Sequence, residues 1–262
     1  MRFFRRKARP DECTRLEADP PVRSNSTVRL PRYIYQPLDK PDEEFRLLRI
    51  SKDALTHQPQ CTLHRYRLRN CPEYTALSYT WGKPTPTHSV AVNGASLEVR
   101  QNLFDFLQAY TTEPWGIDAI GRPVFYWIDQ VCINQDDLLE RSDQVRIMNR
   151  IYRRAKMVLT WLGYDPQFIE AVRRLRDEGD DDTLADDTRE AIYTLSFHTY
   201  FKRIWIIQEI ALSTNPPLFV CGEIELDWDR ARSVIGRLSQ DFLFAVWATV
   251  RGDGHGLKRR TL

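Results

Sequence analysis

The stretch Tyr126-Trp-Ile-Asp-Gln-Val-Cys-Ile-Asn-Gln135 is an apolar run that ends in a group of polar side chains. Residues 125–133 are rich in aromatic and β-branched side chains, which predicts a buried central strand. A strand buried on both faces carries few charges, so Asp129 within it requires an explanation. The following Asp137-Leu-Leu-Glu140 fits a capping box at the start of a helix. Strand, polar corner and helix is the arrangement of a ligand site at the carboxyl end of a strand in an α/β sheet.

The bulk composition excludes several classes of protein. A chain of 262 residues with 42% hydrophobic residues suits one large domain with a substantial core. The net charge of +2 gives no support for binding nucleic acid or an acidic membrane surface. No apolar run approaches the roughly 18 residues of a membrane span. The five cysteines are odd in number and contain no CxxC pair, which is typical of reduced thiols and predicts a cytoplasmic protein.

The two ends of the chain differ in composition from the middle. Residues 1–30 are rich in Arg, Pro, Ser and Asp without periodicity, so we expect them to be disordered. Their basic start lacks the apolar segment of a secretory signal. We expect one globular domain over residues 31–250 and a flexible tail over 251–262.

Hydrophobic periodicity predicts an α/β fold. Short strands are expected at 45–50, 61–66 and 74–79, and Asn93-Gly94 predicts a type I′ turn in a hairpin over 89–99. The remaining expected elements are helices over 102–110, 137–155, 166–176, 187–197, 199–213 and 228–239, strands over 157–162, 218–221 and 223–226, and an acidic insertion over 177–187. Because strands alternate with helices through the middle of the chain, we expect a mainly parallel central sheet flanked by helices, with added N-terminal strands and the hairpin.

Glu209 is the first candidate functional residue. The segment 200–212 is apolar on almost all sides, so it is expected to be a buried helix in which Trp205 and Glu209 share one face. A carboxylate among aromatic side chains is costly unless it is paired, protonated or used in chemistry, and burial raises its pKa. Glu209 is therefore either a functional carboxylate or half of a structural ion pair with Arg203 or another arginine.

Other candidates divide in the same way. Asp129 is either a second site residue or a cap for the turn at 134–137. Cys132 has no neighbouring His in the sequence and is interpreted as a small core residue rather than a nucleophile. Four further side chains, His57, Cys61, His64 and Cys71, lack the paired spacing of a zinc site, so no metal is expected. The chain has no GxGxxG, P-loop, GxSxG or HExxH motif, which argues against kinases, nucleotide switches, dehydrogenases and serine hydrolases.

Several of these stretches, taken together, resemble the heterokaryon-incompatibility (HET) domain of filamentous fungi. They follow the family's order over about residues 33–222, and the matching blocks are Tyr74–Gly82, Trp127–Gln135, Glu140-Arg141, Gln144-Val145, Met148, Ile151-Tyr152, Val158–Gly163 and Arg203–Glu209. The resemblance implies a role in non-self recognition that triggers programmed cell death when incompatible cells fuse. Gln130-Val131 departs from the Ala-Ile that the family usually has. The chain has little beyond the domain, so we expect either that a partner or regulatory module lies on another protein or that the chain is a reduced paralogue.

A second resemblance suggests chemistry. Ser78-Tyr79 at the end of a strand and Trp205 four residues before Glu209 are similar to motifs of Toll/interleukin-receptor (TIR) domains, some of which cleave NAD. This resemblance implies a TIR-like or flavodoxin-like core and a catalytic Glu209 that stabilises an oxocarbenium-like transition state. Tyr79 or Trp81 would stack on a base or on nicotinamide, with Trp205 beside them, and Asp129 or Asn134 would bind a ribose or polarise a water. NAD would be the substrate, with no resident cofactor, and catalysis would require self-association.

Two hypotheses follow. In the first, the chain is an NAD-cleaving enzyme that kills by depleting NAD and depends on Glu209. In the second, it is a non-catalytic signalling module that assembles with like domains or other cell-death proteins, and Trp81, Trp205 and Glu209 support the fold or an interface. The first hypothesis requires Glu209 to open on a pocket shared with the Trp81 loop, whereas a Glu209 sealed by a bidentate arginine favours the second.

Overall fold

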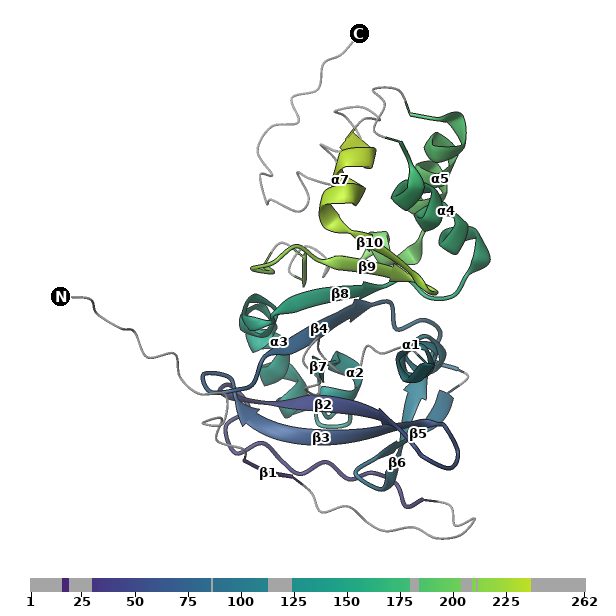
Figure 1. The fold of residues 1–262 in the computed structure, drawn as a ribbon. Coiled ribbons are helices and arrows are strands. Elements are labelled where there is room, and N and C mark those ends of the chain that lie inside the picture. Colours follow the sequence, from purple (N-terminus) through teal and green to yellow (C-terminus); the bar gives the residue numbers. More distant parts are fainter. Residues whose placement is uncertain are drawn as a thin grey trace, which may run out of the picture.

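One mixed sheet organises the computed structural model, which describes residues 16–18, 30–85, 87–112, 124–179, 184–203, 209–210 and 212–236. Its ten strands run in the order β10-β9-β8-β4-β7-β2-β3-β5-β6, with β1 paired to β3 (Figure 1). The strands are β1 (Leu16–Ala18), β2 (Glu44–Lys52), β3 (Pro59–Arg67), β4 (Tyr74–Tyr79), β5 (Thr87–Val92), β6 (Ala95–Arg100), β7 (Phe125–Trp127), β8 (Met157–Trp161), β9 (Leu218–Cys221) and β10 (Ile224–Asp227). The helices are α1 (Gln101–Thr112), α2 (Asp129–Cys132), α3 (Leu138–Arg154), α4 (Pro166–Asp177), α5 (Asp186–Ser196), the 3₁₀ helix η3 (Thr199–Lys202) and α7 (Trp228–Gly236).

The α/β class is confirmed, but the prediction of a mainly parallel sheet is wrong. Four neighbouring strands, β7-β4-β8-β9, are parallel. Around them β2 pairs antiparallel with both β3 and β7, β5 with β6, and β9 with β10. The prediction extended the strand–helix alternation of the middle of the chain to the whole sheet. The stretch from β2 to β6 has no helix between its strands; β3 and β5 still pair parallel, but strands joined by short turns, β2 with β3 and β5 with β6, pair antiparallel.

The hairpin prediction is confirmed by its turn. Asn93 and Gly94 both adopt positive φ angles, 49° and 80°, as a type I′ turn requires. The register Val92↔Ala95 follows directly from this turn. The side chain of Asn93 also accepts a hydrogen bond from the backbone N–H of Leu63 at 2.9 Å, which fastens the hairpin to β3.

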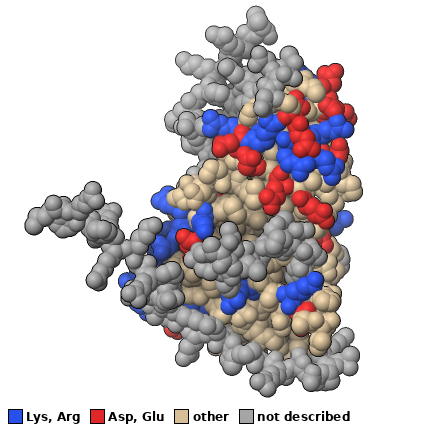
Figure 2. All heavy atoms as spheres, viewed as in Figure 1, with Lys and Arg blue, Asp and Glu red and all other residues tan. Residues whose placement is uncertain are grey.

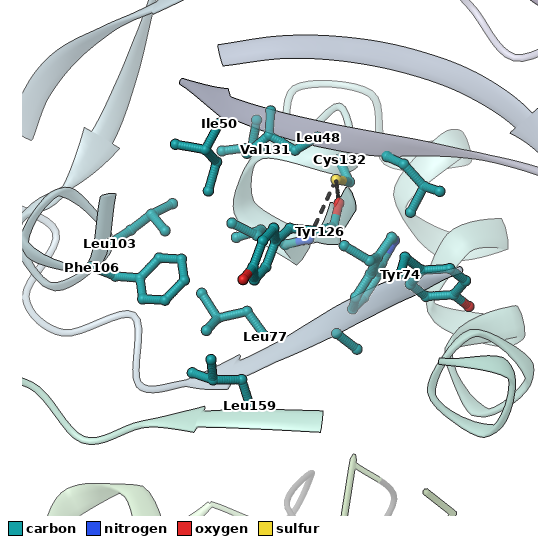
Figure 3. Close-up of a cluster of buried hydrophobic side chains, with 14 of the residues drawn as sticks. Leu48, Ile50, Tyr74, Leu77, Leu103, Phe106, Tyr126, Val131, Cys132 and Leu159 are labelled. Atoms are coloured by element: carbon teal, nitrogen blue, oxygen red, sulfur yellow. Dashed lines mark hydrogen bonds between the residues drawn. The ribbon is translucent and has the colours of Figure 1, made fainter. Parts of the chain in front are cut away.

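The predicted central strand over 125–133 is too long. β7 ends at Trp127, and a single helical turn, α2, follows, closed by a hydrogen bond of 2.7 Å from the N–H of Cys132 to the carbonyl of Ile128. In Figure 3 the side chains of Val131 and Cys132 lie beneath Leu48 of β2, and the Cys132 thiol contacts the backbone on either side of Trp127. Burial of the apolar side chains is therefore achieved by a strand followed by a turn. Cys132 is a core residue, as predicted.

α1 and α3 cover opposite faces of the parallel strands. Tyr126 packs against Phe106 of α1, whereas the next residue, Trp127, packs edge-to-face on Tyr152 of α3 at 5.4 Å between ring centroids. Adjacent residues of a strand point to opposite faces, so the two helices enclose the sheet. Figure 3 shows Leu103 and Phe106 of α1 directed at Tyr126.

The start of α3 was predicted at the correct position, but only one of the two hydrogen-bonding partners of the predicted capping box, Asp137, acts as a cap. Asp137 is the N-cap and accepts hydrogen bonds from the N–H groups of Leu139 and Glu140 at 3.0 and 3.1 Å. Glu140 does not return a bond to Asp137, as a full capping box would. Its carboxylate accepts from the N–H of Asn134 at 2.8 Å and pairs with the buried Arg46.

A second hydrophobic cluster lies beyond β8, where α4, α5 and α7 pack on β9 and β10. The outer surface of α4 and α5 carries interleaved basic and acidic side chains (Figure 2), with ion pairs such as Arg174–Glu170 and Arg176–Asp177. The predicted helix over 199–213 is wrong at its start, because η3 ends at Lys202 and Arg203 is extended. Glu209 and Ile210 are helical, while residues 204–208 lie outside the described residues.

Other predictions reach the edge of the described residues. Of the segment 1–30, the structure describes Leu16–Ala18, which pair with β3, and Leu30. The tail 251–262 lies outside the described residues. Among the residues described, no three His, Cys, Asp or Glu side chains gather in a way that would hold a metal ion. None of the described helices is both long and apolar enough to cross a membrane.

Candidate functional site

Polar side chains gather where β4 and β7 end. The two strands are parallel with Ala76 opposite Trp127, so the residues that follow them reach the same edge of the sheet. Trp81, after β4, donates its indole N–H to Asp129, after β7, at 2.8 Å. Tyr79 donates its hydroxyl to the side chain of Gln130 at 3.0 Å. The carboxyl ends of adjacent parallel strands thus meet in a side-chain network, as expected for an α/β site.

This edge is also a switch point of the sheet. Numbered along the chain, the parallel strands β7-β4-β8-β9 have the order 2-1-3-4, and ligands in such sheets bind where the order reverses, here between β4 and β8. Asn102 fills one side of this point: it donates to the carbonyl of Thr80 at 2.6 Å and accepts from the Trp161 indole at 3.0 Å. Gly163, after β8, has a φ of +91°, and a Cβ there would approach the Asn102 side-chain oxygen to 3.3 Å.

Asp129 is a part-buried carboxylate with a perturbed pKa. Its Oδ2 accepts from Trp81 and its Oδ1 from the N–H of Gln130 at 2.7 Å. Burial raises the pKa of Asp129 to about 6, and the negative charge of Glu209 adds to the increase, while the Trp81 hydrogen bond and the positive charge of Arg203 oppose it. Asp129 therefore titrates close to neutral pH, where groups that transfer protons operate.

Glu209 is buried, and both of its carboxylate oxygens are occupied. The Arg203 guanidinium donates to Oε1 at 3.0 Å and to Oε2 at 3.2 Å, and the Ser78 hydroxyl donates to Oε2. Ser78 of β4 and Thr160 of β8 are register partners, and the hydroxyl of Tyr200 contacts both, at 2.7 and 3.2 Å. The carboxylate thus lies in a hydroxyl-lined recess against the sheet.

The two carboxylates belong to one electrostatic cluster. Glu209 raises the pKa of Asp129, and Arg203 lowers it. Burial raises the pKa of Tyr79 well above 10, with Asp129 as the next cause, and burial likewise raises that of Tyr152, with Glu209 next. Asp129 and Glu209 thus influence each other electrostatically, and the charge of Arg203, which is paired with Glu209, acts on both.

The structure brings together four of the six predicted site residues: Tyr79, Trp81, Asp129 and Glu209. Asn134 belongs to the turn before α3, where its side-chain oxygen accepts from the N–H of Asp136 at 3.3 Å, so its predicted place beside the substrate receives no support. Trp205 lies outside the described residues. The alternative prediction for Glu209, an ion pair with Arg203, is confirmed. The alternative for Asp129 is wrong, because the N–H groups of Asn134 and Asp136 in that turn donate to Glu140 and Asn134, whereas the Asp129 carboxylate accepts from Trp81 and Gln130.

Sequence reasoning missed several members of the cluster. Ser78, Thr160, Tyr200, Gln130 and the Arg100 guanidinium, 4.9 Å from the centre of the Trp81 ring, were not predicted. Ser78, Thr160 and Gln130 lie inside stretches quoted for the family resemblance, but the sequence does not show which side chains they contact: Glu209 for Ser78, Tyr200 for Thr160 and Tyr79 for Gln130. Tyr200 and Arg100 carry no such signal, since their contacts depend on the tertiary fold.

The hollow that stands out in the described part of the chain is not beside Glu209. It lies between α4 and α5 and is lined by charged side chains that include Arg173, Arg174, Asp177 and Glu178. At Glu209 itself, the bidentate Arg203 and the 1% exposed fraction of the side chain are the observations that favour a sealed carboxylate.

These observations define an α/β domain with a carboxylate–guanidinium–phenol cluster at the carboxyl edge of its parallel strands. A sequence model of the family described as Heterokaryon incompatibility protein (HET) matches residues 74–209, just over half of the chain. The chain belongs to this family. The cluster residues from Ser78 to Glu209 all lie within the match.

One curated relative is similar over a larger part of the chain. It is the Heterokaryon incompatibility protein 6, OR allele, of Neurospora crassa, 29% identical over 238 residues that take in 71% of this chain and 34% of the relative. The chain therefore spans about a third of that relative's length. No solved structure matches the chain.

Proposed function

We propose that this chain is a signalling domain of heterokaryon incompatibility, acting in fungal non-self recognition and programmed cell death. Membership of the family and the Neurospora relative support this role. The observation that carries it is that residues up to 131 positions apart in the family match, from Ser78 to Glu209, join in one hydrogen-bonded cluster. The buried free thiols of Cys61, Cys132 and Cys221 suit action in the reducing cytoplasm.

Within this role we propose cleavage of NAD into nicotinamide and ADP-ribose. The order 2-1-3-4 of the parallel strands supports the resemblance to a TIR-like or flavodoxin-like core. Carboxylates at the edge of the sheet would stabilise the positive charge that develops on the ribose. The reaction would depend on Glu209, with Tyr79, Trp81 and Asp129 beside the substrate and Trp205 on the segment that precedes Glu209.

A non-catalytic role is the second candidate, and one observation favours it. Both oxygens of Glu209 are held by Arg203 and the side chain is sealed from solvent. In this alternative the cluster fastens the fold, and the chain acts by assembling with like domains or with other incompatibility proteins. Self-association is common to both candidates.

The experiment measures NAD loss and nicotinamide release by the purified chain, clustered by fusion to an oligomerising scaffold, beside viability of a fungus that expresses it. Glu209→Gln is compared with Glu170→Gln, an exposed carboxylate of α4 that serves as the matched control. Turnover that falls in Glu209→Gln and stays in Glu170→Gln supports the enzyme. Cell death without turnover supports the assembly module. Normal viability with the wild-type chain contradicts the incompatibility role.

A further inference from the structure

We infer that Asp129 is the carboxylate that acts on the substrate directly, as the general base for the attacking water, and that Glu209 is a positioning residue. This inference rests on the proposed cleavage of NAD. The bond between C1′ of the ribose and the nicotinamide nitrogen breaks, and its electron pair neutralises the positive charge of the ring. A water oxygen forms a bond to C1′, and its proton passes to Asp129 and then to solvent. The products are ADP-ribose, nicotinamide and one proton.

Access to solvent separates the two carboxylates. Glu209 is 1% exposed, and contact with a substrate would require its bidentate ion pair to break. Asp129 is only part-buried and stands at the first position of α2, on the open edge where β4 and β7 end. The Asp129 carboxylate is bonded to Trp81 and Gln130 and not to Arg203, so contact with a reacting water breaks no ion pair recorded in the described residues.

Hydrogen bonding leaves Asp129 free to accept a proton. Each of its oxygens accepts one bond from a neutral donor, the Trp81 indole N–H or the Gln130 backbone N–H. An ionised carboxylate has about four lone-pair directions, so these bonds orient the group and leave others unused. Trp81 is itself held in place by the Arg100 guanidinium 4.9 Å from its ring centre. The Asp129 carboxylate is therefore held in one orientation and still has acceptor positions for a proton.

The charges around Asp129 tune it for this task. Burial holds its pKa at about 6, so near neutral pH it is ionised and still basic enough to take a proton. The titratable and charged groups that interact with it are Tyr79 of β4, Cys132 of α2, Tyr152 of α3, Arg203 after η3, and Glu209. Arg203 favours the ionised form, and Glu209 fixes Arg203 through two hydrogen bonds, which is the positioning role.

The two carboxylates then predict different kinetics. In Asp129→Asn, kcat falls about 100-fold or more, because a general base contributes roughly 10²–10⁴-fold. In Glu209→Gln the loss is smaller, and the acid limb of the pH–rate profile moves, because the variant removes the Glu209 charge and releases Arg203, and both charges act on the pKa of Asp129. A Glu209 that does not act on Asp129 would leave the position of that limb unchanged.

Chemical rescue separates a base from a structural residue. The scaffold-clustered chain is assayed for nicotinamide release with Asp129→Ala, Glu209→Gln and the exposed control Glu170→Gln, each with and without sodium formate. We expect formate to restore turnover to Asp129→Ala alone, since a small carboxylate can take the vacated place. The wild-type kcat should also fall as the pH drops below about 6, a result that needs no variant to fold.

Each outcome decides the question. Rescue by formate together with the acid limb supports the assignment. Turnover that Asp129→Asn retains, or an acid limb absent from the wild type, overturns the assignment and leaves NAD cleavage standing. No turnover by the clustered wild type overturns both.

Discussion

Two buried arginine–carboxylate pairs hold this domain together, and they differ in what surrounds them. Arg46–Glu140 is closed on all sides, with side chains 2% and 6% exposed and contacts of 2.6 and 2.9 Å. Arg203–Glu209 has longer contacts of 3.0 and 3.2 Å, and the arginine side chain is 20% exposed while the glutamate is 2% exposed.

The two ion pairs also differ in their other hydrogen-bond partners. Arg46 also donates to the carbonyls of Gln36 and Cys132, and Glu140 accepts from the N–H of Asn134, so this pair binds backbone of three segments to one another. The remaining partner of Glu209 is the side-chain hydroxyl of Ser78, and the charge of Arg203 also acts on Asp129. A bidentate ion pair is therefore not evidence of function by itself; the backbone partners of Arg46–Glu140 indicate a fold contact, whereas the second carboxylate near Arg203–Glu209 is what marks a candidate site.

The largest expected effect is the loss of the closed pair. Glu140→Gln leaves Arg46 buried without a counter-charge, and removal of one partner of a buried ion pair costs about 3–5 kcal/mol. Urea unfolding followed by tryptophan fluorescence measures this change in the free energy of unfolding. The double variant Arg46→Met with Glu140→Leu should recover a large part of it, because apolar replacement of both partners is often neutral. A single variant within about 1 kcal/mol of wild type would contradict the structural role.

The same measurement on the site pair should give a smaller effect. Arg203→Met leaves Glu209 with the Ser78 hydroxyl, and a carboxyl group can protonate to escape an unpaired charge. We expect a loss of about 1–3 kcal/mol in the free energy of unfolding. A loss equal to that of Glu140→Gln would mean that both pairs are fold contacts and would remove the distinction between them.

The sequence indicated the site pair but not the closed pair, for a physical reason. Glu209 stands in an apolar segment beside Arg203, six residues away, so both the burial and the partner could be predicted locally. Arg46 and Arg49 lie on the same strand with similar neighbours in the sequence, yet Arg46 is buried and Arg49 is exposed. What separates them is Glu140, 94 residues further on. Hydrophobic periodicity predicts which side chains are buried, but it does not predict which residue far away in the sequence will pair with them.

The same limit explains the errors in the fold. The run at 125–133 was correctly predicted to be buried, but burial does not distinguish a strand from a strand followed by the turn of α2. The convergence of Trp81 and Asp129 at one edge could be expected, since both follow strands of a parallel pair. The order of the strands could not, because it depends on long-range pairing.

A third, smaller effect tests the hydrogen bond that orients Asp129. Trp81→Phe keeps an aromatic ring against Arg100 but removes the indole donor, which lowers the pKa of Asp129. The pKa of Asp129 should therefore rise above its value of about 6, as measured by ¹³C NMR titration of the side-chain carboxyl. The free energy of unfolding should change by only about 1 kcal/mol. An unchanged titration would show that the indole N–H does not stabilise the charged form.

The smallest expected effect is a pH dependence of local stability around His198, whose neighbour Tyr200 lies against the Glu209 recess. His198 donates from Nε2 to the carbonyl of Leu162 at 2.9 Å and accepts at Nδ1 from the N–H of Tyr200 at 3.1 Å, so it must be neutral, and burial lowers its pKa below 6.5. The unfolded chain then binds more protons as the pH falls through 6.5, and the stability that His198 contributes is lost below that pH. Asp129 has the opposite sign, because its folded pKa is raised, and its contribution to stability grows as the pH falls from about 6 toward 3.8.

Hydrogen exchange can separate these two opposed contributions residue by residue. On acidification, protection of the Tyr200 amide should fall once intrinsic rates are corrected, because a protonated Nδ1 can no longer accept its hydrogen bond. The Leu162 amide, bonded to Val220 at 2.8 Å, is the internal control and should stay protected. His198→Gln should remove the pH dependence at Tyr200. If the Tyr200 and Leu162 amides lost protection together, acid would unfold the whole domain at once. That result would contradict a local effect of His198 protonation near Glu209.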